Sequence, residues 1–207
     1  MDKDIYIVRH GRTDYNKLKI WQGSGVDSSL DAIGIEQSQA FYKSYCSASF
    51  DLIIHSSLKR SKETVQPFID DGIDSLVVPE INEISWGFNE GKPHTSESLA
   101  EYRRVIGAWS KENYEVAFKG GESAADLAFR VGKFLGFLKT LTYHKVLICS
   151  HGRTIRAILS LMQQEPLLAM EKYEHANTGL FIGKQIDNKF SIDIFNNTDH
   201  LESSPKS

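Results

Sequence analysis

The sequence predicts an α/β protein, a three-layer α/β/α sandwich with a mostly parallel central sheet. Short apolar runs such as residues 5–8 and 146–149 alternate along the chain with segments of helical periodicity, an order typical of parallel strands connected by helices. The runs are apolar throughout, as expected for strands covered on both faces. The 207 residues, 41% hydrophobic and 25% charged, fit one domain of ordinary globular composition.

The first expected strand, residues 5–8, is followed by a polar, glycine-containing stretch that continues to Leu30. A loop of about 20 residues is unusually long, and such loops in compact domains are usually functional or disordered. Asp31 is expected to cap a helix that runs to about Tyr45. The next strand is expected over residues 52–55.

A helix is expected from about Leu58 and should end by Phe68, because Pro67 lacks the N–H group that a continuing helix needs. Residues 76–78 then form a candidate third strand, which Pro79 ends.

Two further helices are predicted from capping patterns followed by apolar stripes. Residues 98–113 carry apolar side chains at helical spacing, with Ser98 and Glu101 as a capping box. Ser123 and Asp126 repeat that pattern before the clearest helical stripe in the chain. The remaining expected elements are a strand over residues 146–149, a helix over 154–162, and strands over 178–182 and 190–195.

Charge and hydropathy exclude several classes of protein. The formal net charge is −3, from 24 Lys and Arg against 27 Asp and Glu, so the chain lacks the basic excess of a nucleic-acid binder. The longest apolar runs are about four residues, against the roughly 18 that a membrane-spanning helix needs. We therefore expect no nucleic-acid partner and no membrane partner.

The two cysteines, Cys46 and Cys149, are isolated from each other in the sequence. They form neither a CxxC redox motif nor a cysteine-based zinc site, and we expect both to be buried, reduced thiols. The first residues contain no long apolar stretch followed by a small-residue cleavage site, so we expect no secretory signal and a cytoplasmic location.

Histidines and arginines follow the predicted strands at the point where each strand ends. Arg9 and His10 come directly after residues 5–8, His151 follows the strand at 146–149, and Arg60 lies in the first turn of the helix after the strand at 52–55. In open α/β sheets, ligands bind beyond the carboxyl ends of the strands. A cationic rim in a slightly acidic protein indicates an anion, and the planar guanidinium fork suits phosphate oxygens.

At these residues the chain resembles a known family. Residues 9–16, RHGRTDYN, resemble the RHGxTxxN signature of the histidine phosphatase, or phosphoglycerate-mutase-like, superfamily. Asp31 stands where the family has Thr, and Ser61 where it has Ala. Further segments resemble the family's motifs in the expected order over almost the whole chain: Gln22-Gly23 (QG), residues 30–37 (LTxxGxxQ), 57–64 (SxLxRAxxT), 83–91 (ExxxGxxEG), 120–123 (GGES) and 150–152 (SHG).

The resemblance implies that His10 is the nucleophile, which takes the phosphoryl group onto a ring nitrogen until water removes it. His10 must be neutral to attack, and we expect Arg9, Arg60 and a protonated His151 to keep it so. The same three groups would stabilise the charge of the transferring phosphoryl group. The residues expected to bind substrate are Asn16, Thr13, Gln22, Gly23 and Gly152, the last through its backbone amide.

The resemblance assigns the general acid to Glu83, which would protonate the leaving oxygen, with Glu90 as the rival carboxylate. No cofactor is expected. The seven histidines show no metal-ligand spacing, so no metal is predicted, and His55, His94, His144 and His175 are expected to be structural or surface residues.

The resemblance implies one domain over residues 1–201 with a small helical cap around residues 92–122, and a polar tail over 202–207. The expected activity is that of a histidine acid-type phosphomonoesterase, a metal-independent phosphatase that hydrolyses a small phosphorylated metabolite through a phosphohistidine. The specific monoester is left open, and a homodimer is compatible with the sequence.

Two alternatives stay open. The first is a cofactor-dependent phosphoglycerate mutase, for which Arg103 and Arg104 in the cap would imitate a carboxylate-binding pair, although a solvated basic face is the simpler interpretation. The second is a phosphate-binding module without turnover. The interval between residues 91 and 120 is short for the mutases, which favours hydrolysis. His200 is a candidate for a tail that folds back over the site.

Overall fold

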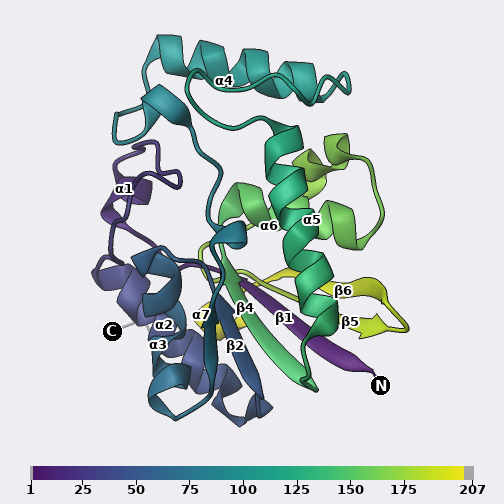
Figure 1. The fold of residues 1–207 in the computed structure, drawn as a ribbon. Helices are drawn as coiled ribbons and strands as arrows, with labels where there is room; N and C mark the ends of the chain where they lie inside the picture. The colour runs from purple at the N-terminus through teal and green to yellow at the C-terminus, as the bar shows by residue number, and fades with distance from the viewer. Residues whose placement is uncertain (1, 203–207) are drawn as a thin grey trace.

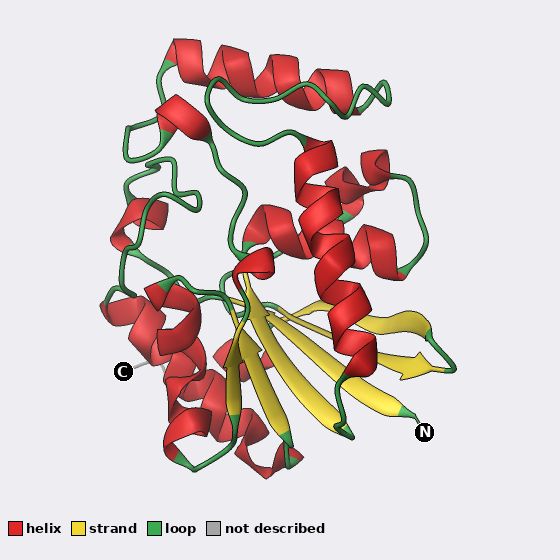
Figure 2. Cartoon of the chain, in the orientation of Figure 1, coloured by secondary structure: helices red, strands yellow, loops and turns green. Residues whose placement is uncertain are grey.

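A six-stranded mixed sheet forms the centre of the protein, with helices on both faces (Figures 1 and 2). The computed structural model describes residues 2–202. The strand order is β3-β2-β4-β1-β5-β6. The strands are β1 (Lys3–Arg9), β2 (Leu52–His55), β3 (Ser75–Val77), β4 (Lys145–Ser150), β5 (Leu180–Ile186) and β6 (Lys189–Asn197).

Four strands run parallel and two do not. β1 pairs in parallel with β4, and β2 pairs in parallel with both β4 and β3. β5 runs antiparallel to β1 and β6 antiparallel to β5, so they close one side of the sheet as a hairpin. The predicted fold class, an α/β sandwich with a mostly parallel sheet, is confirmed.

The helices follow the predicted order. They are α1 (Asp14–Lys17), α2 (Ala32–Tyr45), α3 (Lys59–Asp70), α4 (Ser96–Trp109), α5 (Ala124–Thr140), α6 (Gly152–Met162) and α7 (Asp199–Glu202). Short 3-10 helices are η1 (Cys46–Ala48), η2 (Pro79–Ile81), η3 (Gly87–Asn89) and η4 (Leu167–Lys172). Among the residues described, no helix is both long and apolar enough to cross a membrane.

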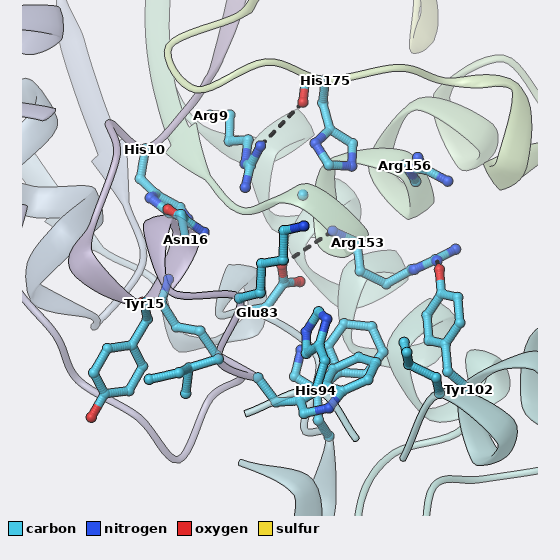
Figure 3. A pocket seen from close by; sticks show the side chains of 17 residues that line it. Arg9, His10, Tyr15, Asn16, Glu83, His94, Tyr102, Arg153, Arg156 and His175 are labelled. Atoms are coloured by element: carbon cyan, nitrogen blue, oxygen red, sulfur yellow. Dashed lines mark hydrogen bonds between the residues drawn. The ribbon is translucent and has the colours of Figure 1, made fainter. Parts of the chain in front are cut away.

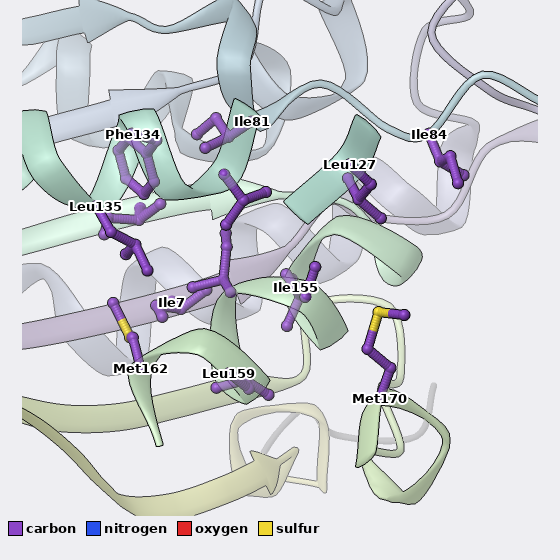
Figure 4. Close-up of a cluster of buried hydrophobic side chains, with 14 of the residues drawn as sticks. Ile7, Ile81, Ile84, Leu127, Phe134, Leu135, Ile155, Leu159, Met162 and Met170 are labelled. Atoms are coloured by element: carbon purple, nitrogen blue, oxygen red, sulfur yellow. The ribbon is translucent and has the colours of Figure 1, made fainter. Parts of the chain in front are cut away.

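The two faces of the sheet bury separate apolar cores because successive strand residues point to opposite sides. Ile7 of β1 belongs to the core shared with α5 and α6, which also contains Leu127, Phe134 and Ile155 (Figure 4). Val8, the next residue, belongs to the second core, with Phe41 of α2 and Phe68 of α3 as its largest members. The central strands β1 and β4 are therefore apolar at consecutive positions, as the sequence predicted.

Four predicted details were wrong. Helix α3 continues through Pro67 to Asp70. Burial of Phe68 against the ring of Phe41, with 5.7 Å between ring centroids, offsets the hydrogen bond that proline cannot donate. Cys46 is exposed, because it lies in η1 at the surface, whereas Cys149 is buried within β4.

The other two details concern the limits of α4. The helix begins one turn earlier than predicted, because Thr95 caps it and the Ser98 side chain reaches back to the Thr95 backbone. The carboxylate of Glu101, the predicted capping partner, instead accepts hydrogen bonds from Asn89 and Lys119. The helix also ends at Trp109 rather than near residue 113.

α4 lies apart from the sheet, on the side toward which the carboxyl ends of β2 and β4 point (Figure 2). It belongs to residues 92–122, the predicted helical cap. Glu202, the first residue of the predicted polar tail, ends α7, and residues 203–207 lie outside the described part of the chain. The domain boundary at residue 201 stays a prediction.

Helix α2 packs its backbone directly against the loop after β1. A Cβ atom at Gly34 would lie 2.0 Å from the carbonyl oxygen of Arg12, closer than any real contact. We expect Gly34→Ala to lower the free energy of unfolding by about 1–3 kcal/mol, because the rigid backbone must move to admit the methyl group. Urea denaturation measures this change.

Gly136→Ala is the matched control. Gly136 lies in α5 with no atom within 4 Å of its ideal Cβ position. Alanine there is expected to raise the free energy of unfolding by about 1 kcal/mol, since glycine is a poor helix former. If Gly34→Ala is as stable as the unmodified protein, the close approach of α2 is not a constraint.

Candidate active site

The backbone of His10 is held by three different elements. Its N–H donates to the carbonyl of Ser150 at the end of β4, at 3.0 Å. Asn177 donates through Nδ2 to the carbonyl of His10 at 3.0 Å, and the next amide, that of Gly11, donates to Oγ1 of Thr64 in α3 at 2.9 Å. The residue is 2% exposed. Its position is therefore set by the sheet and α3 together.

The His10 ring has a defined tautomer. Its Nδ1 lies 2.7 Å from the carbonyl oxygen of Gly11. Because a carbonyl oxygen only accepts, Nδ1 carries the proton and Nε2 carries the lone pair. The ring of His151 approaches that of His10, with 5.0 Å between centroids. The two histidines that the sequence placed at separate strand ends lie in contact.

His151 takes the opposite tautomer because of its partners. Nε of Arg60, which only donates, lies 3.2 Å from His151 Nδ1, so Nδ1 accepts and Nε2 carries the proton. That Nε2 lies 2.7 Å from Oγ of Ser56, whose hydroxyl lies 2.7 Å from Oγ of Ser61. Ser61 in turn donates to the carbonyl of Leu58 at 2.9 Å. Each group in this chain donates to the next, from the Arg60 guanidinium to the carbonyl of Leu58.

Arg60 is fully buried and connects three parts of the site. Besides His151, its guanidinium donates to the carbonyl oxygens of Gly23 at 3.2 Å and Val26 at 2.7 Å. The loop after α1 is thereby fastened onto the histidine pair. Burial lowers the pKa of Arg60 to about 10, so the side chain remains charged at neutral pH.

Arg9 comes off the end of β1 beside His10. One terminal nitrogen donates to the carbonyl of His175 at 3.1 Å, while its Nε is buried without a hydrogen-bond partner. Burial lowers the pKa of Arg9 to about 10, which again leaves a positive charge at neutral pH.

Both histidines of the pair are neutral at pH 7. Burial lowers the pKa of His10 well below 6.5, and the positive charges of Arg60 and Arg9 lower it further. The same causes, in the same order of burial and then Arg60, lower the pKa of His151. The expectation that a protonated His151 keeps His10 neutral was therefore wrong for the free protein, because burial and the arginines suffice.

Glu83 lies between η2 and η3 and is 7% exposed. Its Oε1 accepts hydrogen bonds from the amides of Ile84 at 2.9 Å and Thr154 at 3.1 Å, and Oε2 accepts from the amide of Arg153 at 3.2 Å. Two of these amides belong to the first turn of α6, which has unpaired N–H groups to offer. The carboxylate is thus fixed at that helix end.

The segment that carries Glu83 is held by Arg130 of α5, which the sequence analysis missed. Its guanidinium donates to the carbonyls of Glu80 at 2.7 Å and Asn82 at 2.8 Å, and it pairs with the carboxylate of Glu122. The rival carboxylate, Glu90, accepts from the amides of Trp86 and Gly25 and fastens two loops together.

A cavity of about 380 Å³ opens in front of His10 (Figure 3). Six predicted site residues line it, namely Arg9, His10, Asn16, Gln22, Glu83 and Gly152. Arg60 and His151 are fully buried and do not line it.

Two predicted contacts face elsewhere. Thr13 is buried, caps α1 and donates to Gln22 at 2.8 Å. Gly23 presents its carbonyl to Arg60, and a Cβ at this position would strike Glu90. Neither residue lines the cavity, because Thr13 is directed to Gln22 within its own loop and the Gly23 carbonyl is directed to Arg60.

The cavity contains lining residues that sequence reasoning did not select. Two of them, Arg153 and Arg156, closely follow the SHG segment at residues 150–152. Their nearness to that motif was the sequence feature that could have identified them. His94 and His175, expected to be structural, also line the cavity. The other missed lining residues are Tyr15, Lys19, Ile20, Trp21, Trp86, Leu99 and Tyr102.

Three residues of undecided role lie outside the cavity. Arg103 and Arg104 are exposed on α4, and Arg104 donates to the carbonyl of Ala117. His200 is buried, with Nε2 3.0 Å from Oγ1 of Thr178 and its ring against Phe41. Helix α7 therefore packs on α2 instead of covering the site. In residues 2–202, no cluster of three or more His, Cys, Asp or Glu side chains could hold a metal ion.

Comparison with known proteins gives concordant matches. The model of the histidine phosphatase superfamily (branch 1) matches residues 5–198. A putative phosphoserine phosphatase 2 from Hydrogenobacter thermophilus is 32% identical over 161 residues, which cover 77% of this chain and 78% of that protein. An adenosylcobalamin/alpha-ribazole phosphatase from Escherichia coli is 26% identical over 189 residues, covering 90% and 92% respectively.

The fold also matches a solved structure. The putative alpha-ribazole-5'-P phosphatase of Escherichia coli K-12 superposes with a TM-score of 0.82 at 23% identity, covering 94% of this chain and 96% of that one. At this level of identity, the match shows that the two proteins share a fold.

The hydrogen bonds predict opposite tautomers for the two neutral rings. At pH 7, ¹⁵N NMR of the imidazoles is expected to show the proton on Nδ1 of His10 and on Nε2 of His151. Ser56→Ala should weaken the preference in His151, because it removes the partner of Nε2, and leave His10 unchanged. A protonated ring at either position, or the same tautomer in both, would contradict the geometry.

Stability is expected to fall as the pH falls from 7 to 5. The unfolded chain binds protons on His10 and His151 below pH 6.5, whereas the folded protein, in which both pKa values are depressed, does not. Each ring therefore lowers the free energy of unfolding by about 2 kcal/mol between pH 7 and pH 5. Urea denaturation across the range measures the loss, and His10→Asn should make it shallower. A flat profile would show that the rings titrate normally.

Proposed function

The chain belongs to the histidine phosphatase superfamily, and from this we propose that it is a histidine acid-type phosphomonoesterase that hydrolyses a small phosphate monoester without a metal ion. The observation that carries the proposal is the His10 ring, which is neutral, has its proton on Nδ1 and lines the cavity. A neutral imidazole whose other nitrogen is fixed by a carbonyl is an activated nucleophile.

In the first step, Nε2 of His10 forms a bond to phosphorus while the bond from phosphorus to the ester oxygen breaks. The departing alkoxide needs a proton, and Glu83 supplies it as the carboxyl group that lines the same cavity. In the second step, water attacks the phosphohistidine and gives its proton to the Glu83 carboxylate. Inorganic phosphate leaves, and both groups return to their starting forms.

Positive charge around His10 supports the transition state, in which negative charge spreads over the phosphoryl oxygens. Arg9 lines the cavity and has a buried Nε without a partner, so it can bind an oxygen without losing an existing bond from that nitrogen. Arg60, which donates to His151, contributes its charge without lining the cavity. Asn16 and the amide of Gly152, at the start of α6, are the neutral donors.

Hydrolysis is better supported than the two alternatives. The carboxylate-binding pair that the mutase interpretation offered, Arg103 and Arg104, is exposed on α4 and does not line the cavity. A binding module without turnover is the less economical explanation, since His10, His151 and Glu83 are all present and arranged around one site. The cytoplasmic location and the homodimer stay predictions.

Detection of a phosphohistidine on His10 tests the proposal. Brief mixing with a phosphate monoester, followed by an alkaline quench and mass spectrometry, should show phosphate on His10. His10→Ala should lose this adduct and at least about 10³-fold in kcat, as for the loss of a nucleophile. EDTA should leave the rate unchanged.

The control variant is His144→Ala, because His144 is exposed and lies outside the cavity. It should retain both the adduct and the rate. Retained turnover in His10→Ala, or dependence on an added metal, would overturn the proposal. Transfer from bisphosphoglycerate to 3-phosphoglycerate faster than hydrolysis would establish the mutase instead.

A further inference from the structure

One wall of the cavity carries two further arginines and a histidine, separate from the residues around His10. Arg153 and Arg156 project from α6, and His175 lies beside them in the loop before β5 (Figure 3). We call these three residues the arginine wall. The mechanism proposed above uses none of their side chains.

The two arginines are held together by one carboxylate. Glu171, in η4, pairs with Nη1 of Arg153 through one oxygen and with Nη1 of Arg156, at 3.0 Å, through the other. Arg153 also donates to the hydroxyl of Tyr102 at 2.8 Å and lies over the ring of Trp109. Arg153 is therefore fixed on two sides and 4% exposed. Both arginines thus have protein partners that position them before any ligand binds.

Unpaired polar atoms gather at this wall. Within residues 2–202, five buried side-chain nitrogen or oxygen atoms have no hydrogen-bond partner, and three belong to cavity-lining residues: Nε of Arg9, Nε of Arg156 and Nδ1 of His175. Buried polar groups are nearly always paired, so each exception calls for an explanation. Two of these three atoms belong to the arginine wall.

The charges at the cavity do not balance. A phosphoryl dianion would offset Arg9 and Arg60. The remaining cations that line the cavity are Lys19, Arg153 and Arg156. With Glu83 protonated as the general acid, the carboxylate that faces them is Glu171, so two positive charges are left over. Burial, and after it the neighbouring Arg153, lowers the pKa of Arg156, while the Glu171 carboxylate opposes this shift.

The rest of the lining limits the size and character of the ligand. Trp21, Trp86 and Tyr102 form an aromatic side of the cavity, with 5.2 Å between the ring centroids of the two tryptophans. A volume of about 380 Å³ is near the lower end for ligand pockets. It suits a compact ester with few atoms beyond the phosphate.

We infer that the substrate is a small phosphate monoester whose leaving group carries a carboxylate, and that Arg156 is the residue that binds this carboxylate. The inference rests on the proposed function and names its substrate class. Arg156 has one guanidinium nitrogen paired with Glu171 and a buried Nε without a partner, whereas both terminal nitrogens of Arg153 are engaged. Arg153 and Glu171 are positioning residues that hold the Arg156 fork in place.

Two esters with the same carbon skeleton test the inference. In 3-phosphoglycerate a carboxylate stands where glycerol 3-phosphate has a hydroxymethyl group. We expect the protein to favour 3-phosphoglycerate in kcat/KM by about 10- to 100-fold, as expected for a charge-assisted hydrogen bond. Arg156→Met should reduce the ratio of the two kcat/KM values at least about tenfold, and Arg156→Lys should reduce it less, because the charge remains without the fork.

Arg103→Met is the matched control, because it removes an arginine that is exposed on α4 and does not line the cavity. It should leave the ratio unchanged. An unmodified protein that hydrolyses both esters at similar kcat/KM, or an Arg156→Met variant with an unaltered ratio, would overturn the inference while hydrolysis itself stands.

Binding provides a measurement that does not need turnover. In His10→Ala, calorimetry should show 3-phosphoglycerate binding about tenfold or more tightly than glycerol 3-phosphate, and adding Arg156→Met should remove the difference. If the unmodified protein forms no phosphohistidine with any ester, the proposed function fails. Equal affinities in His10→Ala would then decide against the carboxylate site on separate grounds.

Discussion

The hydrogen bond from Nε of Arg60 to Nδ1 of His151 governs the organisation of the site. Because a guanidinium only donates, this bond leaves the proton of His151 on Nε2 and sets the direction of the hydrogen bonds through Ser56 and Ser61. The same guanidinium holds the loop at Gly23. One buried cation therefore fixes a ring, a loop and the first turn of α3.

Burying a cation is costly unless its donors are satisfied. For Arg60, carbonyl oxygens and an imidazole nitrogen meet this need without a carboxylate in direct contact, so its charge remains available to a ligand. Arg153 and Arg156 follow a different design, in which Glu171 shares its two oxygens between two guanidiniums. The cations in and around the cavity are thus neutralised to different degrees, and this difference distinguishes the two ends of a ligand.

Sequence reasoning predicted the fold class and the meeting of His10 with His151, because both follow strands whose carboxyl ends share one edge of the sheet. It did not find His175, whose position depends on the path of the chain between η4 and β5, where no periodicity is present. Arg156 resembles an ordinary polar helix residue in sequence. His200 packs on Phe41 because an apolar ring surface was available there.

The strand order determines which parts of the sheet can unfold locally without disturbing the site. β4 and β1, which deliver the two imidazoles, are neighbours in the middle of the sheet, while β3 and β6 form its borders. Edge strands lose their hydrogen bonds first in native-state fluctuations, whereas central strands open only when the whole protein unfolds. Local unfolding of either edge strand leaves the His10 and His151 rings together. The site should therefore persist while the protein is folded and be lost only in global unfolding.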